Sequence, residues 1–217
     1  MALTPAGRAK SIALIDEMNL AALVAGATLV GGPNFGRAVH PVIPPTFAPP
    51  ELLGPLSAFL KDHPFDSNVF GMTRFPDDER NPGPDAPLAS ALSIARTACT
   101  DHGLELHLAS DRAIADDLWT NVTAHMWASR YGIAFLEDRS GGGVNLNLTI
   151  EVGAMLVTGR RLALLRDKSI ARMPTNLVGK IYKPVDLELT DQVSGAIHGW
   201  LRDDLGLRSC KRCPSHI

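Results

Sequence analysis

Short apolar runs alternate with longer helical patterns from residue 65 to residue 205, and this alternation restricts the fold more than any other feature. The runs at 69–75, 104–108, 131–136 and 162–165 have the length of buried strands, and a fifth is expected near Lys180–Tyr182. Apolar residues recur at helical spacing over 85–103, 114–129, 147–158 and 187–205, and Asp85 is expected to cap the first of these helices. Strands that alternate with helices form a parallel sheet covered on both faces. The sequence therefore predicts an α/β fold, with about five strands in a doubly wound, three-layer α/β/α sandwich.

The chain on either side of this pattern has a different composition. Residues 1–64 start with a helical pattern, and the stretch from Gly31 to Pro55 is rich in Pro and Gly, which indicates an extended connector. A short helix is expected from about Glu51 to Lys61. We therefore expect an N-terminal helical extension and connector in 1–64, a flavodoxin-like domain in 65–205 and a tail in 206–217.

Charge and hydropathy exclude several classes of partner. The net charge of -2 over 217 residues and the lack of a basic stripe argue against nucleic-acid binding. The uncharged run Met18–Gly32, about 15 residues, is too short to cross roughly 30 Å of hydrocarbon. We therefore expect no membrane partner and a cytoplasmic protein. Cys210 and Cys213 favour a mobile tail, with a metal or redox role as the alternative.

Three loops carry polar side chains to the edge where open α/β sheets bind ligands, beyond the carboxyl ends of their strands. The side chains of interest follow the first, second and third strands in turn: Thr73 and Arg74; Asp111 and Asp117; Asp138, Ser140, Asn145 and Asn147. Asp117 is equally suited to begin the next helix. The glycines at 141–143 lack the lysine of a phosphate-binding loop, so a flexible loop is the favoured interpretation.

Glu151 is the candidate catalytic residue. It follows Asn147 by four positions and so shares its helix face, in a helix that is otherwise almost wholly apolar. A carboxylate in such a place either has a buried partner or points into a cleft. A helix N-terminus favours the ionised form, which suits a nucleophile or a group that stabilises an oxocarbenium centre. The alternative is a structural salt bridge to Arg160 or Arg166.

The loop and helix around Glu151 resemble a known superfamily. Asp138-Arg139-Ser140 followed by Asn145-Leu146-Asn147-Leu148-Thr149-Ile150-Glu151-Val152-Gly153-Ala154 is similar to the signature D-x-S … N-x-N-x-x-x-E-x-G-x-A. That signature belongs to nucleoside 2-deoxyribosyltransferase-like proteins and to TIR-like predicted nucleotide-binding proteins of bacterial antiviral systems. The resemblance spans roughly residues 67 to 190.

This resemblance implies that Glu151 acts at an anomeric carbon and that the polar residues of the three loops line a nucleotide or ribose pocket. The expected function is cleavage of an N-glycosidic bond in NAD or a related nucleotide or nucleoside, and the resemblance implies a role in bacterial antiviral defence. A non-catalytic nucleotide sensor that signals to a partner protein and a nucleoside 2-deoxyribosyltransferase are the alternatives. We expect a homo-oligomer that uses no cofactor and no metal, with NAD or a nucleotide as substrate or ligand.

Overall fold

A computed structural model describes residues 42–77, 79–111, 113–171 and 183–207. The compact unit considered below begins at Ile43. The expected helix in the N-terminal extension, the strand expected at Lys180–Tyr182, and Cys210 and Cys213 lie outside the described residues.

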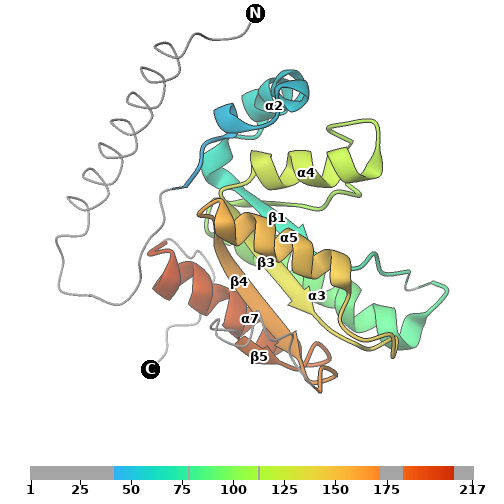
Figure 1. Ribbon diagram of the computed structural model, residues 1–217. Helices are drawn as coiled ribbons and strands as arrows, with labels where there is room; N and C mark the ends of the chain where they lie inside the picture. Colours follow the sequence, from blue (N-terminus) through green and yellow to red (C-terminus); the bar gives the residue numbers. More distant parts are fainter. Residues whose placement is uncertain (1–41, 78, 112, 172–182, 208–217) are drawn as a thin grey trace, which may run out of the picture. The chain divides into compact units, whose positions relative to one another are not determined.

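Five parallel strands form one sheet in the order β2-β1-β3-β4-β5 (Figure 1). They are β1 (Asn68–Met72), β2 (Glu105–His107), β3 (Tyr131–Leu136), β4 (Arg161–Asp167) and β5 (Lys183–Val185). This order is that of flavodoxin-like folds, in which the chain changes direction across the sheet between β1 and β3. The predicted doubly wound, three-layer α/β/α architecture is confirmed.

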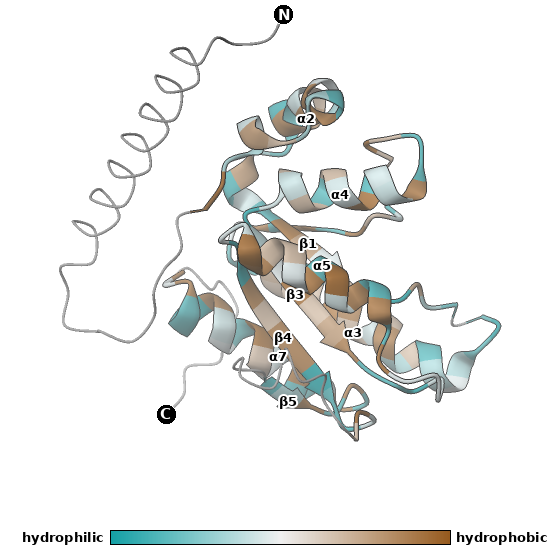
Figure 2. Cartoon of the chain, viewed as in Figure 1, coloured by the Kyte–Doolittle hydropathy of each residue, from teal (hydrophilic) through white to brown (hydrophobic). Residues whose placement is uncertain are grey.

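Helices cover both faces of the sheet because successive strand residues point to opposite sides. They are α3 (Pro82–Asp101), α4 (Leu118–Ala128), α5 (Leu146–Val157) and α7 (Thr190–Gly199), which a π-helical turn, Trp200–Asp204, continues. Val69, Ile133 and Phe135 pack with α3 and α7 on one face. Phe70 and Met72 pack with α4 and α5 on the other. In Figure 2 the strands and much of α5 are brown, as expected for elements that form these two cores.

Several element boundaries differ from the prediction. Strand β1 ends at Met72 rather than at Phe75, and α4 begins at Leu118 rather than near Ile114. Helix α3 begins at Pro82, so Asp85 is not its cap: the Asp85 side chain is buried inside the first turn. Pro at the first helical position is favourable because its missing N–H has no acceptor there.

The Pro-rich stretch up to Pro55 is not an extended connector throughout. Residues Pro45–Phe47 form a 3₁₀ turn, and α2 (Pro50–Asp62) starts at a proline. Leu52, Leu56 and Phe59 of α2 pack against Ala124 and Ala128 of α4 in a third apolar cluster. This tertiary contact makes α2 part of the compact unit, although its sequence precedes the first strand.

No helix among the described residues has the length and apolar character needed to span a membrane.

Candidate functional site

Glu151 lies in the second turn of helix α5, which follows the loop after β3 and packs on the sheet face formed by Phe70 and Met72. Asn145 caps the helix by accepting a hydrogen bond from the backbone N–H of Asn147 at 2.9 Å. Leu148, Val152 and Met155 turn inward and are buried on the sheet. Glu151 lies beside this apolar stripe and is half-buried. The predicted common helix face of Asn147 and Glu151 follows from these bounds, since both lie in α5 four residues apart.

The Glu151 carboxyl has no hydrogen bond or ion pair with any residue that the structure describes. The expected alternative, a salt bridge to Arg160 or Arg166, is not formed. Arg160 instead donates to the backbone carbonyls of Met126 and Ser129, each at 3.0 Å. Burial without a partner raises the pKa of Glu151 to about 7.

This raised pKa contradicts the expectation that the helix N-terminus keeps Glu151 ionised. The electrostatic effect of a helix end falls off within the first turn. Glu151 is the sixth residue of α5 and is surrounded by apolar side chains, so loss of hydration outweighs the helix dipole. A carboxyl of this kind exchanges a proton near neutral pH, which suits a general acid or base better than a permanently charged group.

Thr73 is a second polar group without a partner at this edge. It directly follows β1, and its Oγ1 atom is buried with no hydrogen-bond partner in the described part of the chain. A buried hydroxyl is nearly always hydrogen-bonded, and an exception calls for a reason such as a missing ligand or water. The direction in which the chain crosses the sheet changes between β1 and β3, and Thr73 follows β1 at this point. Folds of this class bind ligands there.

Arg74, in contrast, is fully engaged by carboxylates. Its guanidinium forms an ion pair with Asp85 of α3 and a 2.6 Å bond from Nε to Glu137 Oε1, and it donates to the carbonyl of Pro84 at 3.1 Å. The backbone N–H of Asp77 and the Arg74 guanidinium hold the pKa of Asp85 below its usual value. Arg74 therefore links the ends of β1 and β3 to α3. Its charge is paired with carboxylates, so it is not an unpaired cation that could bind a phosphate group.

A second cluster of charged residues lies at the ends of β3, β4 and β5. Arg139, in the loop after β3, bonds the buried carboxylate of Asp167 at the end of β4, with Nε to Oδ2 at 2.9 Å. It also reaches Asp186 at 3.1 Å and Glu188 at 2.8 Å, both of which follow β5. Lys168 pairs with the same two carboxylates. These contacts fix the start of the loop that leads to α5.

Asp111 and Asp117 serve the local backbone. Asp111 pairs with Arg96 of α3 at 2.7 Å and accepts the backbone N–H of Leu108 at 2.8 Å, which closes the turn after β2. Asp117 caps α4 and accepts the N–H of Thr120 at 3.0 Å. Hydrogen bonds from Thr120 hold the pKa of Asp117 below its usual value. Both carboxylates therefore take part in structural contacts.

The remaining predicted residues belong to the loop between β3 and α5. Asp138 accepts the backbone N–H of Gly143 at 2.7 Å and its own N–H donates to Ser169, so it folds the glycine-rich loop back on itself. Ser140 is exposed in the turn of that loop. Asn147 is exposed, and its side chain has no hydrogen-bond partner among the described residues.

The buried carboxylates Asp85 and Glu137 are the edge residues that sequence reasoning missed. Met72 pairs with Ala134 in the register of β1 and β3, so Arg74 and Glu137 follow neighbouring strand ends. The proximity of Arg74 and Glu137 can therefore be predicted from the sequence once β1 and β3 are known to be neighbours. Asp85 gave the signal of a helix cap, and only the packing of α3 under β1 shows that it faces Arg74.

Among the predicted site residues that the structure describes, the groups that stay available for a ligand are the protonatable carboxyl of Glu151, the hydroxyls of Thr73 and Ser140 and the amide of Asn147. One carboxyl with a pKa near 7 can move a proton, while a hydroxyl and an amide can bind the hydroxyl groups of a sugar. A separate cluster, His63, Glu105 and His107, has the ligand types of a metal centre and lies at the β2 edge.

Comparison of the chain with protein-family models, with curated proteins and with solved structures gave no significant match.

Proposed function

We propose that this protein cleaves the N-glycosidic bond of a nucleoside or nucleotide, NAD included, with Glu151 as the catalytic carboxyl. The observation that carries the proposal is the state of Glu151: half-buried, without a partner among the described residues, and with a pKa of about 7. The structural carboxylates of Glu137 and Asp167, in contrast, have arginine partners, and those of Asp117 and Asp138 accept backbone N–H groups. Perturbed carboxyls without a structural partner concentrate at functional sites.

In the proposed reaction Glu151 acts as the ionised carboxylate, takes up a proton from water and then releases it. The bond between the anomeric carbon and the base nitrogen breaks, and the base leaves with the bonding electron pair. The ionised carboxylate stabilises the positive charge that develops on the sugar and then accepts a proton from the attacking water. The water oxygen bonds to the anomeric carbon, and the proton passes to solvent or to the departing base.

Thr73 and Asn147 are the proposed sugar-binding groups. A ribose hydroxyl that bonded Thr73 Oγ1 would satisfy a buried atom that has no described partner. Asn147 shares the helix face of Glu151, so its amide is suited to a neighbouring hydroxyl. The resemblance of the Asn145–Ala154 segment to nucleoside 2-deoxyribosyltransferase-like and TIR-like proteins supports the same assignment.

Base exchange between nucleosides is the second candidate, and the pairing of the edge arginines favours it. Arg74 and Arg139 both bind carboxylates, so neither supplies an unpaired cation to a phosphate group. A substrate without phosphate groups at these two positions fits better than a dinucleotide. In this reaction a second base, instead of water, attacks the anomeric carbon.

The test is incubation of the purified full chain with NAD, with nucleoside monophosphates and with nucleosides, alone and in pairs, followed by chromatography of the products. Glu151→Gln, which keeps the size of the side chain, is expected to abolish product formation. Glu51→Gln, an exposed glutamate of α2, is the matched control and is expected to retain it. Release of free base from single substrates identifies hydrolysis, and new base–sugar pairs identify exchange.

Two results would reject the catalytic proposal. The first is no product from any of these substrates over a range of protein concentrations that covers its oligomeric states. The second is equal turnover by wild type and Glu151→Gln. If a nucleotide raises the melting temperature without any product, the protein is instead a nucleotide sensor, because a ligand that binds only the native state stabilises it.

A further inference from the structure

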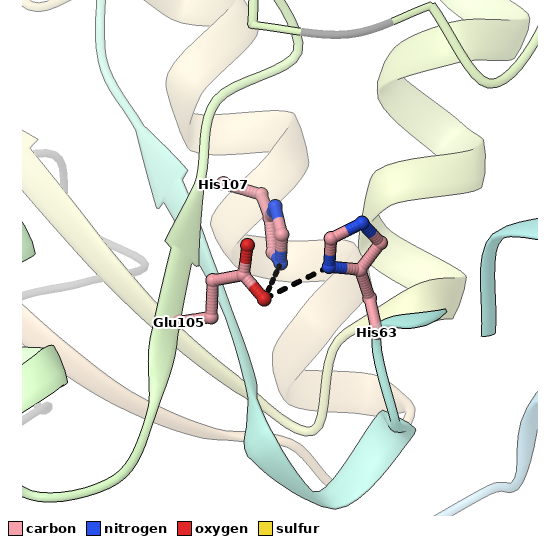
Figure 3. Close-up of side chains that lie close together, drawn as sticks. All are labelled: His63, Glu105 and His107. Carbon is pink, nitrogen blue, oxygen red and sulfur yellow. Dashed lines mark hydrogen bonds and ion pairs between the residues drawn. The ribbon is translucent and has the colours of Figure 1, made fainter. Parts of the chain in front are cut away.

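Three side chains with metal-ligand chemistry converge at the β2 edge of the sheet, and none of them belongs to the proposed glycoside site (Figure 3). Glu105 and His107 lie two residues apart on β2, so they point to the same face of the strand. Leu106 between them points to the opposite core. His63 directly follows α2 and is its C-terminal cap. A helix end and an edge strand thus contribute to one cluster.

The distances between the donor atoms suit a single small cation. His63 Nδ1 lies 2.8 Å from Glu105 Oε2, and His107 Nε2 lies 3.6 Å from the same oxygen. All three donor atoms lie within 4.8 Å of one another. Tetrahedral zinc with bonds of 2.0–2.1 Å to nitrogen and oxygen separates its ligands by about 3.3 Å. The two separations from Glu105 Oε2, 2.8 and 3.6 Å, lie on either side of that value, so small side-chain rotations suffice.

Packing holds both imidazole rings in place independently of the carboxylate. Phe59 of α2 stacks on His63 with 4.6 Å between ring centroids and meets the edge of His107 at 5.2 Å. The amide of buried Asn68 donates to the backbone carbonyl of His63 at 2.8 Å, and its Oδ1 lies 3.3 Å from His107 Nε2. A bond from Nε2 to zinc would replace the second of these contacts, because a ring nitrogen that binds a metal carries no proton to donate.

We propose that His63, Glu105 and His107 bind a zinc ion that ties α2 to the edge strand β2. Two imidazole nitrogens and one carboxylate oxygen form a ligand set that zinc uses when its fourth position is open. Glu105 has 51 % of its side chain exposed, and the side chains of His63 and His107 are 17 % and 9 % exposed. Water reaches the cluster from the Glu105 side and supplies the fourth ligand.

The zinc ion acts as a clamp in this arrangement. Without it, the end of α2 contacts β2 through the hydrogen bond between His63 and Glu105 and through the ring contacts of Phe59 and His63 with His107. With it, three metal–ligand bonds replace that contact. Because the ion binds only when α2 is docked, zinc is expected to raise the melting temperature of the compact unit.

The experiment measures zinc binding to the full chain, free of any histidine tag and stripped with a chelator. Cys210 and Cys213, outside the described residues, are replaced by serine so that their thiols supply no second site. Calorimetric titration with Zn²⁺ is expected to give one equivalent per chain. Titration with Co²⁺ is expected to give ligand-field absorption of a low-coordinate ion without thiolate charge-transfer bands.

Variants in the same serine background locate the site. Glu105→Gln and His63→Gln are expected to weaken zinc binding by about tenfold or more, since even changes outside the ligand shell weaken binding by roughly 10–100-fold. His198→Gln is the control, because it removes an imidazole that lies against His102 and away from the cluster. Glu105→Gln is decisive because this side chain is half-exposed and its amide form does not disturb the core.

The proposal is overturned if the serine variant binds no zinc, or if Glu105→Gln binds it as tightly as its parent. It is supported if binding falls in Glu105→Gln and His63→Gln, remains in His198→Gln, and raises the melting temperature only where it occurs. Zinc binding is measured without substrate, so failure of the glycosidase assay does not affect this test.

Discussion

Replacing Glu151 with glutamine should stabilise the protein, and increasingly so as the pH rises. The folded protein holds the pKa of this carboxyl at about 7, against an ordinary value of 4.5 for the unfolded chain. Between these values the folded state keeps a proton that the unfolded state has lost. Stability from the neutral form is therefore complete below about pH 4.5 and is lost as the pH rises through about 7. Glutamine stays neutral at every pH.

The size of the effect follows from the same two values. A tenfold change in proton affinity corresponds to about 1.4 kcal/mol, so the difference between 4.5 and about 7 sets an upper limit of about 3 kcal/mol. Glu151 is only half-buried, and solvent screening reduces the expected gain to about 1–2 kcal/mol. For a unit of this size that gain corresponds to a rise in melting temperature of roughly 2–8 °C.

Thermal unfolding of wild type and Glu151→Gln at pH 5, 6, 7 and 8 measures this difference directly. All other titrating groups are common to both proteins and cancel in the comparison. The curve for Glu151→Gln should approach that of wild type at pH 5 and lie above it at pH 8. Glu51→Gln should show no such trend. A difference that is constant across this range, or a glutamine variant that is less stable at pH 8, would refute the assignment of a buried carboxyl without a partner.

Three further substitutions test the packing around the sheet edge. Thr73→Val removes a buried hydroxyl that has no described partner. The free energy of unfolding should therefore stay constant or rise by up to about 1 kcal/mol, while KM for a sugar substrate rises. A loss of several degrees in Tm would instead show that the hydroxyl has a hydrogen bond. Asp167→Ala leaves Arg139 without its most buried partner. The free energy of unfolding, measured by urea denaturation, should fall by roughly 3 kcal/mol. An unchanged midpoint of unfolding would contradict the described ion pair. Gly132→Ala places a Cβ atom 2.6 Å from Leu162 Cδ2 and 2.8 Å from Met72 Cε, so it should destabilise by roughly 1–3 kcal/mol, and a melting temperature equal to that of wild type would disprove this close packing.

The resemblance to nucleoside 2-deoxyribosyltransferase-like proteins and the geometry of the edge support different parts of the proposed function. The resemblance is the basis for proposing that Glu151 acts at the anomeric carbon. The geometry supplies the physical property that such a residue needs, since its pKa near 7 lets it accept and release a proton at neutral pH. The pairing of Arg74 with Asp85 and Glu137 is information that no motif contains, and for the proposed reaction it favours a substrate without phosphate at that position.

Local pattern alone determined the layered architecture and much of its detail. The alternation of apolar runs with helical spacing predicts a parallel sheet, because burial on both faces requires it, and β3 (Tyr131–Leu136) has the predicted bounds. The four-residue spacing of Asn147 and Glu151 likewise places both on one helix face, since helix geometry depends only on neighbouring residues.

Tertiary structure alone decided the strand order, the partners of the charged residues and the protonation of Glu151. Glu137 lies 63 residues from Arg74 in sequence, and Glu105 lies 42 from His63, so no local pattern reports either contact. The sequence also suggested an ionised Glu151 from its place near a helix start. Burial against the sheet reverses that expectation, because the loss of hydration depends on which distant side chains cover the carboxyl.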